Sequence, residues 1–228
     1  MTNSNGARRA RLPLREVSVN QDINSLPLRD RKRLQQRAAL LKIALRLFRD
    51  QGFENARMED IARIAEVSVP TVYNYFANKR EVLVELLKQD RHDAQPLYDK
   101  VLANPPQSPA EALASLIHAN VAIIRRPADK RLWREILSAV AKSHDREDDS
   151  FEANHRVFMG YIDRLLRHFI EAGKLSPELP LDIAADVIFA INSQNLRHLA
   201  SSERSSPEKV RELARKQIGF VLDRWSVN

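Results

Sequence analysis

Apolar residues recur every three or four positions along most of this chain, which is the spacing of one face of an α-helix. The first such run predicts a helix over residues 29–51. Gly52 is its stop, because glycine readily adopts the left-handed conformation that ends helices. The apolar positions of this helix are Leu34, Ala38, Leu41, Leu45 and Phe48.

Helix start and stop signals continue downstream. Asn78 and Glu81 form an Asn-x-x-Glu capping box for a helix whose regular part is predicted to end near Pro96. Pro109 opens the next helix as its first residue, and Pro127 is predicted to close it. Four further apolar patterns predict helices around residues 132–140, 150–172, 181–199 and 207–225.

No strand signal competes with these helices. The chain has only five glycines, no Asn-Gly or Asp-Gly hairpin turn and no alternating β-branched run, so we expect an all-α fold of about nine helices. The last two helices are more apolar than one core needs, which predicts that they pair across a two-fold axis into a four-helix dimer interface. The residues concerned are Ile183, Val187, Ile188, Ile191, Val210, Leu213, Ile218, Val221 and Leu222.

The positive charge of the chain is confined to its first third. The whole chain carries a formal charge of +7, residues 1–80 hold 16 Lys and Arg against 8 Asp and Glu, and the remainder is close to neutral. A basic module joined to a neutral one is typical of a protein that meets a polyanion with one part only. The alternative is a solvated basic surface without a partner.

From its composition we expect the protein to be cytoplasmic. There is no cysteine, so a disulfide framework, a thiolate zinc site and a cysteine nucleophile are excluded. The longest uncharged apolar stretch, residues 112–124, is too short to cross a bilayer, and no apolar region of a signal peptide follows the N-terminal arginines. We therefore expect no membrane contact.

Residues 58–79 have the pattern of a helix-turn-helix. Ile61, Ala62 and Ala65 give a short helix one apolar face, residues 66–68 make a tight turn, and Val72 with Phe76 faces back from a second short helix. The outward side of that second helix suits a major groove, since it offers methyl groups, hydroxyls and one amide. The outward residues are Val69, Pro70, Thr71, Tyr73 and Asn74.

At this point the sequence resembles the tetracycline-repressor (TetR) family of bacterial regulators. The matching residues are Phe48, Gly52, Phe53, Ile61, Ala62, Ala65, Val67, Ser68, Thr71, Val72, Tyr73, Tyr75, Phe76, Lys79 and Leu83. The resemblance implies a homodimer, a recognition helix over residues 69–76 and a divergent C-terminal domain that binds a small inducer. It implies phosphate contacts by Thr71, Tyr73, Tyr75 and Lys79, and base-edge contacts by Val69, Pro70 and Asn74. For Tyr73 and Tyr75 the alternative is packing against the first helix.

Two residues depart from the family pattern. Glu66 stands in the turn where the family often has glycine, so it must tolerate any backbone strain of that position. Arg57 stands where the family usually has a capping threonine, which leaves Asp60 without its capping partner. Arg57 is instead a candidate for a DNA phosphate contact.

These patterns divide the chain into three parts. Residues 1–27 are expected to be a disordered basic arm, residues 28–80 a three-helix DNA-binding domain, and residues 81–228 a helical ligand-binding and dimerisation domain. The arm contains four arginines, Arg8, Arg9, Arg11 and Arg15. They either contact DNA, in the minor groove or along the phosphates, or form a solvated tail.

The C-terminal part offers polar and aromatic groups on apolar helices, the mixture found around small-molecule cavities. Each of them alone is more typical of a core or interface position than of a ligand site. No two histidines are spaced for a helical metal site, and we expect no metal and no cofactor. The candidates are His118, Trp133, His155, Phe158, Tyr161, Phe189, Asn192 and Asn195, with Gln194 and His198 near them.

The sequence therefore predicts a ligand-responsive transcriptional regulator. We expect a repressor that binds an inverted-repeat operator in double-stranded DNA as a homodimer and is released by a small-molecule effector. An enzyme is not expected, because there is no glycine-rich phosphate loop, no nucleophile elbow and no His-Glu-x-x-His string. The alternative is a basic helical interaction scaffold without sequence-specific DNA binding.

Overall fold

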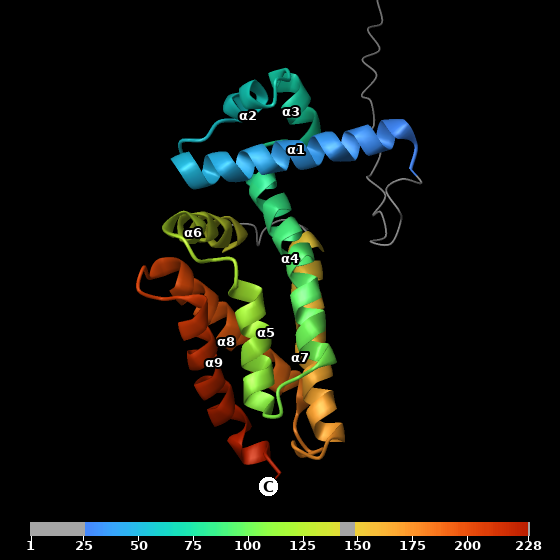
Figure 1. The fold of residues 1–228 in the computed structure, drawn as a ribbon, viewed down its shortest axis with the longest axis vertical. Helices are drawn as coiled ribbons and strands as arrows, with labels where there is room; N and C mark the ends of the chain where they lie inside the picture. Colours follow the sequence, from blue (N-terminus) through green and yellow to red (C-terminus); the bar gives the residue numbers. More distant parts are fainter. Residues whose placement is uncertain (1–25, 142–148, 228) are drawn as a thin grey trace, which may run out of the picture. The chain divides into compact units, whose positions relative to one another are not determined.

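A computed structural model describes residues 26–141 and 149–227, and these two ranges form nine α-helices without a strand (Figure 1). The chain divides into two compact units, residues 1–39 and 40–228, and α1 spans their boundary. Arg8, Arg9, Arg11 and Arg15 lie outside the described residues. The helices are α1 (Leu28–Gln51), α2 (Met58–Ile64), α3 (Val69–Tyr75), α4 (Lys79–Ala103), α5 (Pro109–Val121), α6 (Pro127–Ala141), α7 (Asp149–Glu171), α8 (Leu181–Ser201) and α9 (Pro207–Leu222), followed by a 3₁₀ turn (Asp223–Trp225).

The predicted start and stop signals act as expected at several helix ends. The side chain of Asn78 accepts a hydrogen bond from the Glu81 backbone N–H at 2.9 Å, and so caps α4. Ser206 caps α9 in the same way. Gly52 and Gly173 follow α1 and α7 with φ values of +83° and +69°, the left-handed conformation that ends a helix.

Two predictions from proline were wrong. Helix α4 continues through Pro96 to Ala103, because a proline removes only one intrahelical hydrogen bond and buried side chains such as Tyr98 and Leu87 hold the flanking turns. Helix α5 ends at Val121, and Pro127 begins α6 rather than closing α5. The first position of a helix suits proline, since its N–H would have no intrahelical partner there.

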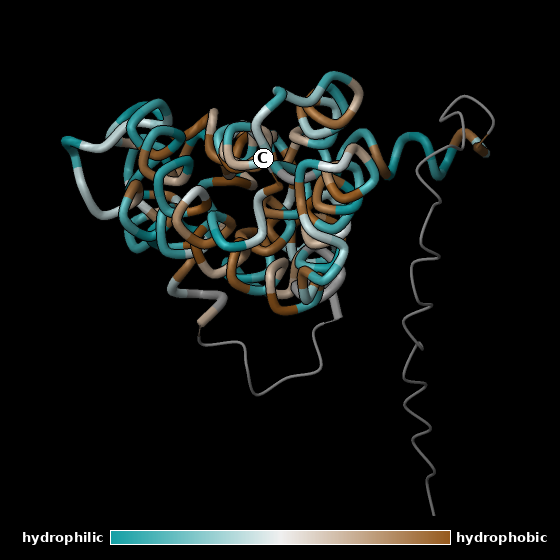
Figure 2. Tube along the Cα trace, turned by 90° about the horizontal axis from the view of Figure 1, so that it is seen from below, coloured by the Kyte–Doolittle hydropathy of each residue, from teal (hydrophilic) through white to brown (hydrophobic). Residues whose placement is uncertain are grey.

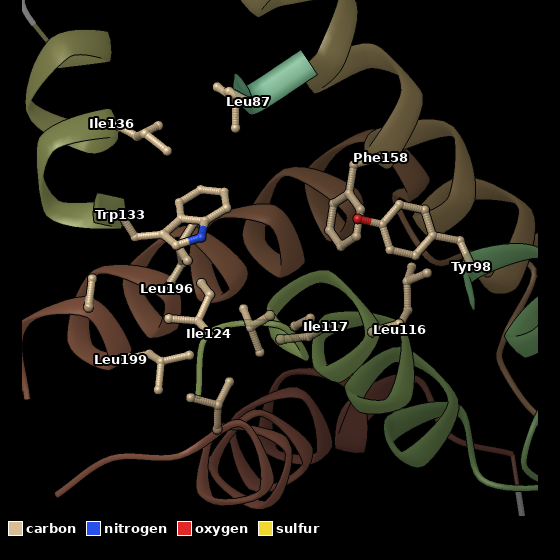
Figure 3. Close-up of a cluster of buried hydrophobic side chains, with 14 of the residues drawn as sticks. Leu87, Tyr98, Leu116, Ile117, Ile124, Trp133, Ile136, Phe158, Leu196 and Leu199 are labelled. Carbon is tan, nitrogen blue, oxygen red and sulfur yellow. The ribbon is translucent and has the colours of Figure 1, made fainter. Parts of the chain in front are cut away.

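Helices α4 to α9 together enclose the hydrophobic core of residues 81–227. Hydrophobic and hydrophilic positions alternate in step with the helical turns (Figure 2), as the sequence predicted. Trp133 of α6 lies beside Leu196 of α8, and Tyr98 meets the ring of Phe158 edge-on with centroids 5.4 Å apart (Figure 3). The large apolar residues along one face of α7 are all buried, namely Phe158, Ile162, Leu165, Leu166 and Phe169.

More apolar residues of α8 and α9 are buried in the core of the single chain than the sequence predicted. Ile188, Val210, Ile218 and Leu222 are fully buried within one chain, so they are not available to a partner. Other apolar residues of these helices remain exposed. They are Ile183 at 57%, Val187 at 36%, Leu213 at 41% and Phe220 at 87%.

No described helix is both long and apolar enough to cross a membrane.

Candidate nucleic-acid interface and internal cavity

Helices α2 and α3 form the helix-turn-helix that the sequence predicts. Ile61 and Ala62 of α2 are buried, and so are Val72 of α3 and Phe76 directly after it. The connecting turn contains Glu66 with φ +54°, the left-handed conformation that glycine adopts most easily. This confirms that Glu66 takes up the strain of a turn in which the family often has glycine.

The N-terminus of α3 is held by Ser68. Its hydroxyl accepts a hydrogen bond from the Thr71 backbone N–H at 3.3 Å and lies 2.7 Å from the Thr71 hydroxyl. A hydroxyl can donate one hydrogen bond and accept two, so Thr71 keeps capacity for a further partner. The cap fixes the direction in which α3 presents its side chains.

The outward side of α3 is arranged as the sequence predicts. Pro70, Tyr73 and Asn74 are exposed, and Tyr73 has 42% of its surface open to solvent. Val69 and Thr71 are half-buried at the start of the helix. Tyr75 is half-buried and packs against the hydrophobic core, so it has a structural role here, whether or not it also reaches DNA.

Arg57 precedes α2 without capping it. Its side chain makes no hydrogen bond to the helix N-terminus and is exposed, and Asp60 binds Arg63 at 3.1 Å instead. The helix therefore begins without a side-chain cap, as the departure from the family pattern predicted. The exposed guanidinium remains a candidate for a phosphate.

Lys79 has a different environment from the one that a phosphate contact requires. Its ammonium group donates to the backbone carbonyls of Phe53, Glu54 and Ala56 at 2.5, 3.0 and 3.0 Å, and it lies 4.4 Å from the centre of the Phe53 ring. An ammonium group has three N–H donors, and all three are in use. Lys79 therefore fastens the α1–α2 loop to the start of α4, and a phosphate contact would require it to leave these carbonyls.

We expect Lys79→Ala to lower the free energy of unfolding by about 1–2 kcal/mol, because three carbonyls lose a charged donor. Urea denaturation measures this loss. Arg80→Ala is the matched control: it removes a neighbouring exposed cation and should cost less than about 0.5 kcal/mol. If Lys79 binds phosphate instead, its replacement will leave stability intact and lower the salt slope of DNA binding by about 1.

A second candidate site is a cavity of about 250 Å³ within residues 40–228, lined by α1, α4, α5 and α6. Its apolar walls include Leu86, Leu97, Ile123, Leu132, Trp133 and Ile136. Its polar lining includes Arg49, Asp90, Asp93, Asn120 and Asp129. Apolar walls with a few polar groups are the usual chemistry of a small-molecule site.

Residues 40–86 match the family described as bacterial regulatory proteins, tetR family. This match covers the helix-turn-helix segment of the chain. A curated relative, the HTH-type transcriptional regulator LuxR of Vibrio harveyi, is 38% identical over 68 residues, which are 28% of this chain and 33% of LuxR. The chain thus spans about a third of the length of this relative.

Solved structures share the fold over most of the chain. The transcriptional regulator FadR of Bacillus subtilis, in complex with stearoyl-CoA, has a TM-score of 0.58 and 17% identity and covers 81% of this chain and 97% of its own. RolR in complex with resorcinol has a TM-score of 0.61 and 21% identity, and covers 85% of this chain and 90% of its own. At this level of identity the comparison establishes the fold alone.

The structure brings together only some of the predicted ligand-binding residues. Trp133 lines the cavity. His155 stacks on Phe189 at 4.0 Å and Phe158 lies beside them, so these three form an aromatic cluster between α7 and α8. The hydroxyl of Tyr161 donates to Asp99, and burial, followed by this hydrogen bond, raises the pKa of Tyr161 to about 12.

The predicted polar residues mostly satisfy one another. Asn192 accepts a hydrogen bond from Asn120 at 3.0 Å, and Asn120 accepts one from the Tyr98 hydroxyl at 2.7 Å. Asn195 donates to Gln217 at 2.8 Å. These bonds join α4, α5, α8 and α9, so the buried asparagines support the packing of the helices.

His118 lies in a shallow polar depression between α5 and α9, away from the main cavity. Burial, followed by the charge of Arg211, lowers its pKa from the ordinary value. Of the two accessory candidates, Gln194 accepts from Arg197, and His198 lies exposed beside the α8–α9 turn.

Sequence reasoning missed the polar lining of the cavity. Asp129 carried one local signal: its carboxylate accepts from the Arg126 backbone N–H at 3.0 Å, the reach-back bond of a capping box. Arg49, Asp90, Asp93 and Asn120 carried none, because their convergence depends on how the helices pack.

Proposed function

We propose that this protein is a ligand-responsive transcriptional regulator that binds DNA through α3. The observation that carries this proposal is the capped recognition helix, whose exposed side presents Pro70, Tyr73 and Asn74 in the segment that matches the tetR family. The excess of basic residues in the first 80 positions supports contact with a polyanion. Regulators of this family bind DNA and small-molecule effectors.

The proposed contacts fall into two kinds. Thr71, Tyr73 and Arg57 bind phosphates, whereas Val69, Pro70 and Asn74 contact base edges in the major groove. Tyr75 is retained as a phosphate candidate at the edge of the core. For Lys79 we propose a positioning role, since its donors hold the α1–α2 loop.

The two kinds of contact have different effects in a binding experiment. We expect Arg57→Ala to weaken binding alike on operator and scrambled DNA and to lower the salt slope by about 1. Asn74→Ala should change the preferred bases, by about 1–3 kcal/mol per altered base pair, while the salt slope stays nearly unchanged. Salt titrations of both variants on both DNAs measure these effects.

Arg63→Ala is the matched control for Arg57, because the Arg63 guanidinium already pairs with Asp60. A change of base preference in Arg57→Ala, together with a pure loss of salt slope in Asn74→Ala, would contradict this placement of α3. Equal binding of all sequences by the wild type would favour the alternative function, a basic interaction scaffold.

The proposed assembly is a homodimer formed through α8 and α9. The support is the exposed apolar surface that these helices keep after their own core is filled: Ile183, Val187, Leu213 and Phe220. A two-fold dimer presents two identical recognition helices, so we propose an inverted-repeat operator. We further propose that the protein represses transcription and that its effector releases it from DNA.

A further inference from the structure

The cavity beside α1 indicates which kind of effector the protein binds. We propose that it takes a cationic amphiphile, a molecule with a protonated amine on an apolar body of about one ring and a short chain. This inference rests on the proposed function, because it names the effector class of the proposed regulator.

The charge of the cavity lining is the first observation. Asp90, Asp93 and Asp129 contribute three carboxylates and Arg49 one guanidinium to the lining, a formal charge of −2, which the adjoining Arg126 guanidinium, 3.4 Å from Asp129, reduces to −1. The chain as a whole carries +7, so the lining is opposite in sign to the protein around it. A cavity of this sign concentrates cations and disfavours carboxylates.

The second observation concerns Asp129, whose side chain is only 3% exposed. Its Oδ1 lies 3.0 Å from Nε of Arg49, yet both atoms are buried and neither has a partner in hydrogen-bond geometry. A buried charged atom without a hydrogen bond is costly, and a ligand N–H would supply the missing donor to Oδ1. Oδ2 already accepts from the backbone N–H and the guanidinium of Arg126, so Oδ1 is the oxygen that a cationic ligand would bind.

The third observation is the apolar surface that accompanies these charges. Leu97 and Ile123 line the cavity and remain 42% and 48% exposed, so they offer apolar surface to a ligand. Trp133 adds the side chain whose ring face attracts cations most strongly. The apolar body of such a ligand would cover Leu97 and Ile123, and its amine would pair with the carboxylates of the lining.

The size of the cavity limits the ligand. At about 250 Å³ it lies below the range of about 300–1,000 Å³ that holds drug-sized molecules. A ring with a short chain fits, and a nucleotide-bearing thioester does not.

The position of the cavity supplies a route to the DNA-binding segment. Arg49 is in the last turn of α1, directly before the loop that leads to α2, and its partner Asp129 is in the first turn of α6. A cation bound to Asp129 competes with Arg49 for that carboxylate. Binding therefore loosens the ion pair between α1 and α6. The ligand then binds more tightly to a conformation in which this pair is open, and such a difference in affinity between two conformations is what an effector needs.

Three probes of one shape test the charge preference: 4-butylbenzylamine, 4-butylbenzyl alcohol and 4-butylbenzoate. Binding is followed by calorimetry, and by Trp133 fluorescence in a Trp225→Phe background, in which Trp133 is the only tryptophan. We expect the amine to bind about tenfold more tightly than the alcohol, and the benzoate to bind most weakly.

The double variant Asp90→Asn/Asp93→Asn tests the residues. It should weaken amine binding about fivefold and leave alcohol binding unchanged. Glu178→Gln/Asp182→Asn is the matched control, because it removes two exposed carboxylates away from the cavity and should change neither affinity. Asp129 stays intact in this experiment, because it also supports α6.

Several results would overturn the inference: equal or tighter binding of the alcohol or the benzoate, equal loss of all three probes in the Asp90/Asp93 variant, or no response to any probe at millimolar concentration. Sequence-specific DNA binding is measured in the same preparations. If it is present and the charge preference is absent, the effector class is wrong and the regulator stands. If the charge preference is present without specific DNA binding, the cavity assignment stands and the proposed function fails.

Discussion

Replacing Phe220 with glutamate is expected to separate the proposed dimer into monomers and to weaken operator binding by about a hundredfold or more. Phe220 is 87% exposed on α9, and Leu213, seven residues earlier, lies on the same face of that helix. Near a two-fold axis the new carboxylate occurs twice in an apolar surface, so each subunit would have to bury an unpaired charge. Sedimentation at micromolar concentration measures the assembly.

Val157→Glu is the control for this variant, because Val157 is also exposed, at 41%, but lies on α7. It should remain a dimer with wild-type operator affinity. A Phe220→Glu protein that stays dimeric would show that the dimer contact lies elsewhere.

Lys130→Met is expected to lower the free energy of unfolding by about 3 kcal/mol. Lys130 is 4% exposed, and its ammonium group donates to the carbonyls of Ser202, Glu203 and Ser205 at 2.7, 3.2 and 2.7 Å. Methionine keeps the length of the side chain but removes the donors, so three carbonyls of the α8–α9 turn, that of Ser205 buried, lose their charged partner. Thermal or urea denaturation measures the loss.

Lys216→Met is the control, since Lys216 is largely exposed and makes one ion pair, with Glu212. Surface pairs of this kind contribute at most about 1 kcal/mol. An equal effect of the two substitutions would mean that the three carbonyl contacts of Lys130 contribute little.

The contacts of Lys130 and Asp129 suggest why the first turn of α6 matters. These adjacent residues hold α6 in two directions, Lys130 to the α8–α9 turn and Asp129 to Arg49 at the end of α1. The same short segment therefore touches the helices proposed for dimerisation and the segment that leads to the DNA-binding helices.

Local patterns in the sequence predicted the helices well, because periodicity and caps are properties of neighbouring residues. The Asn78 cap and the left-handed Gly52 follow from such patterns, whereas strain at Glu66 was inferred from the resemblance to the tetR family. Pro96 was misjudged because packing of the flanking turns outweighs the loss of one hydrogen bond.

The functional residues were harder to predict, because their roles depend on contacts between distant segments. Lys79 matches the family pattern, yet its acceptors lie 23 to 26 residues earlier in the chain. Phe220 lies in an apolar helix, and only the packing of α9 shows which of its residues remain outside the core. The acidic residues of the cavity lining come from two helices, α4 and α6, and no local pattern indicates that they converge.

Selection of bound sequences from random double-stranded DNA tests the central claim most directly. The wild-type protein, at physiological salt, should enrich an inverted repeat whose half-sites are about one helical turn, or a multiple of it, apart. Asn74→Ala should enrich a repeat altered at the same position in both half-sites. Recovery of unrelated sequences without a shared repeat, at affinities set by salt alone, would contradict the account.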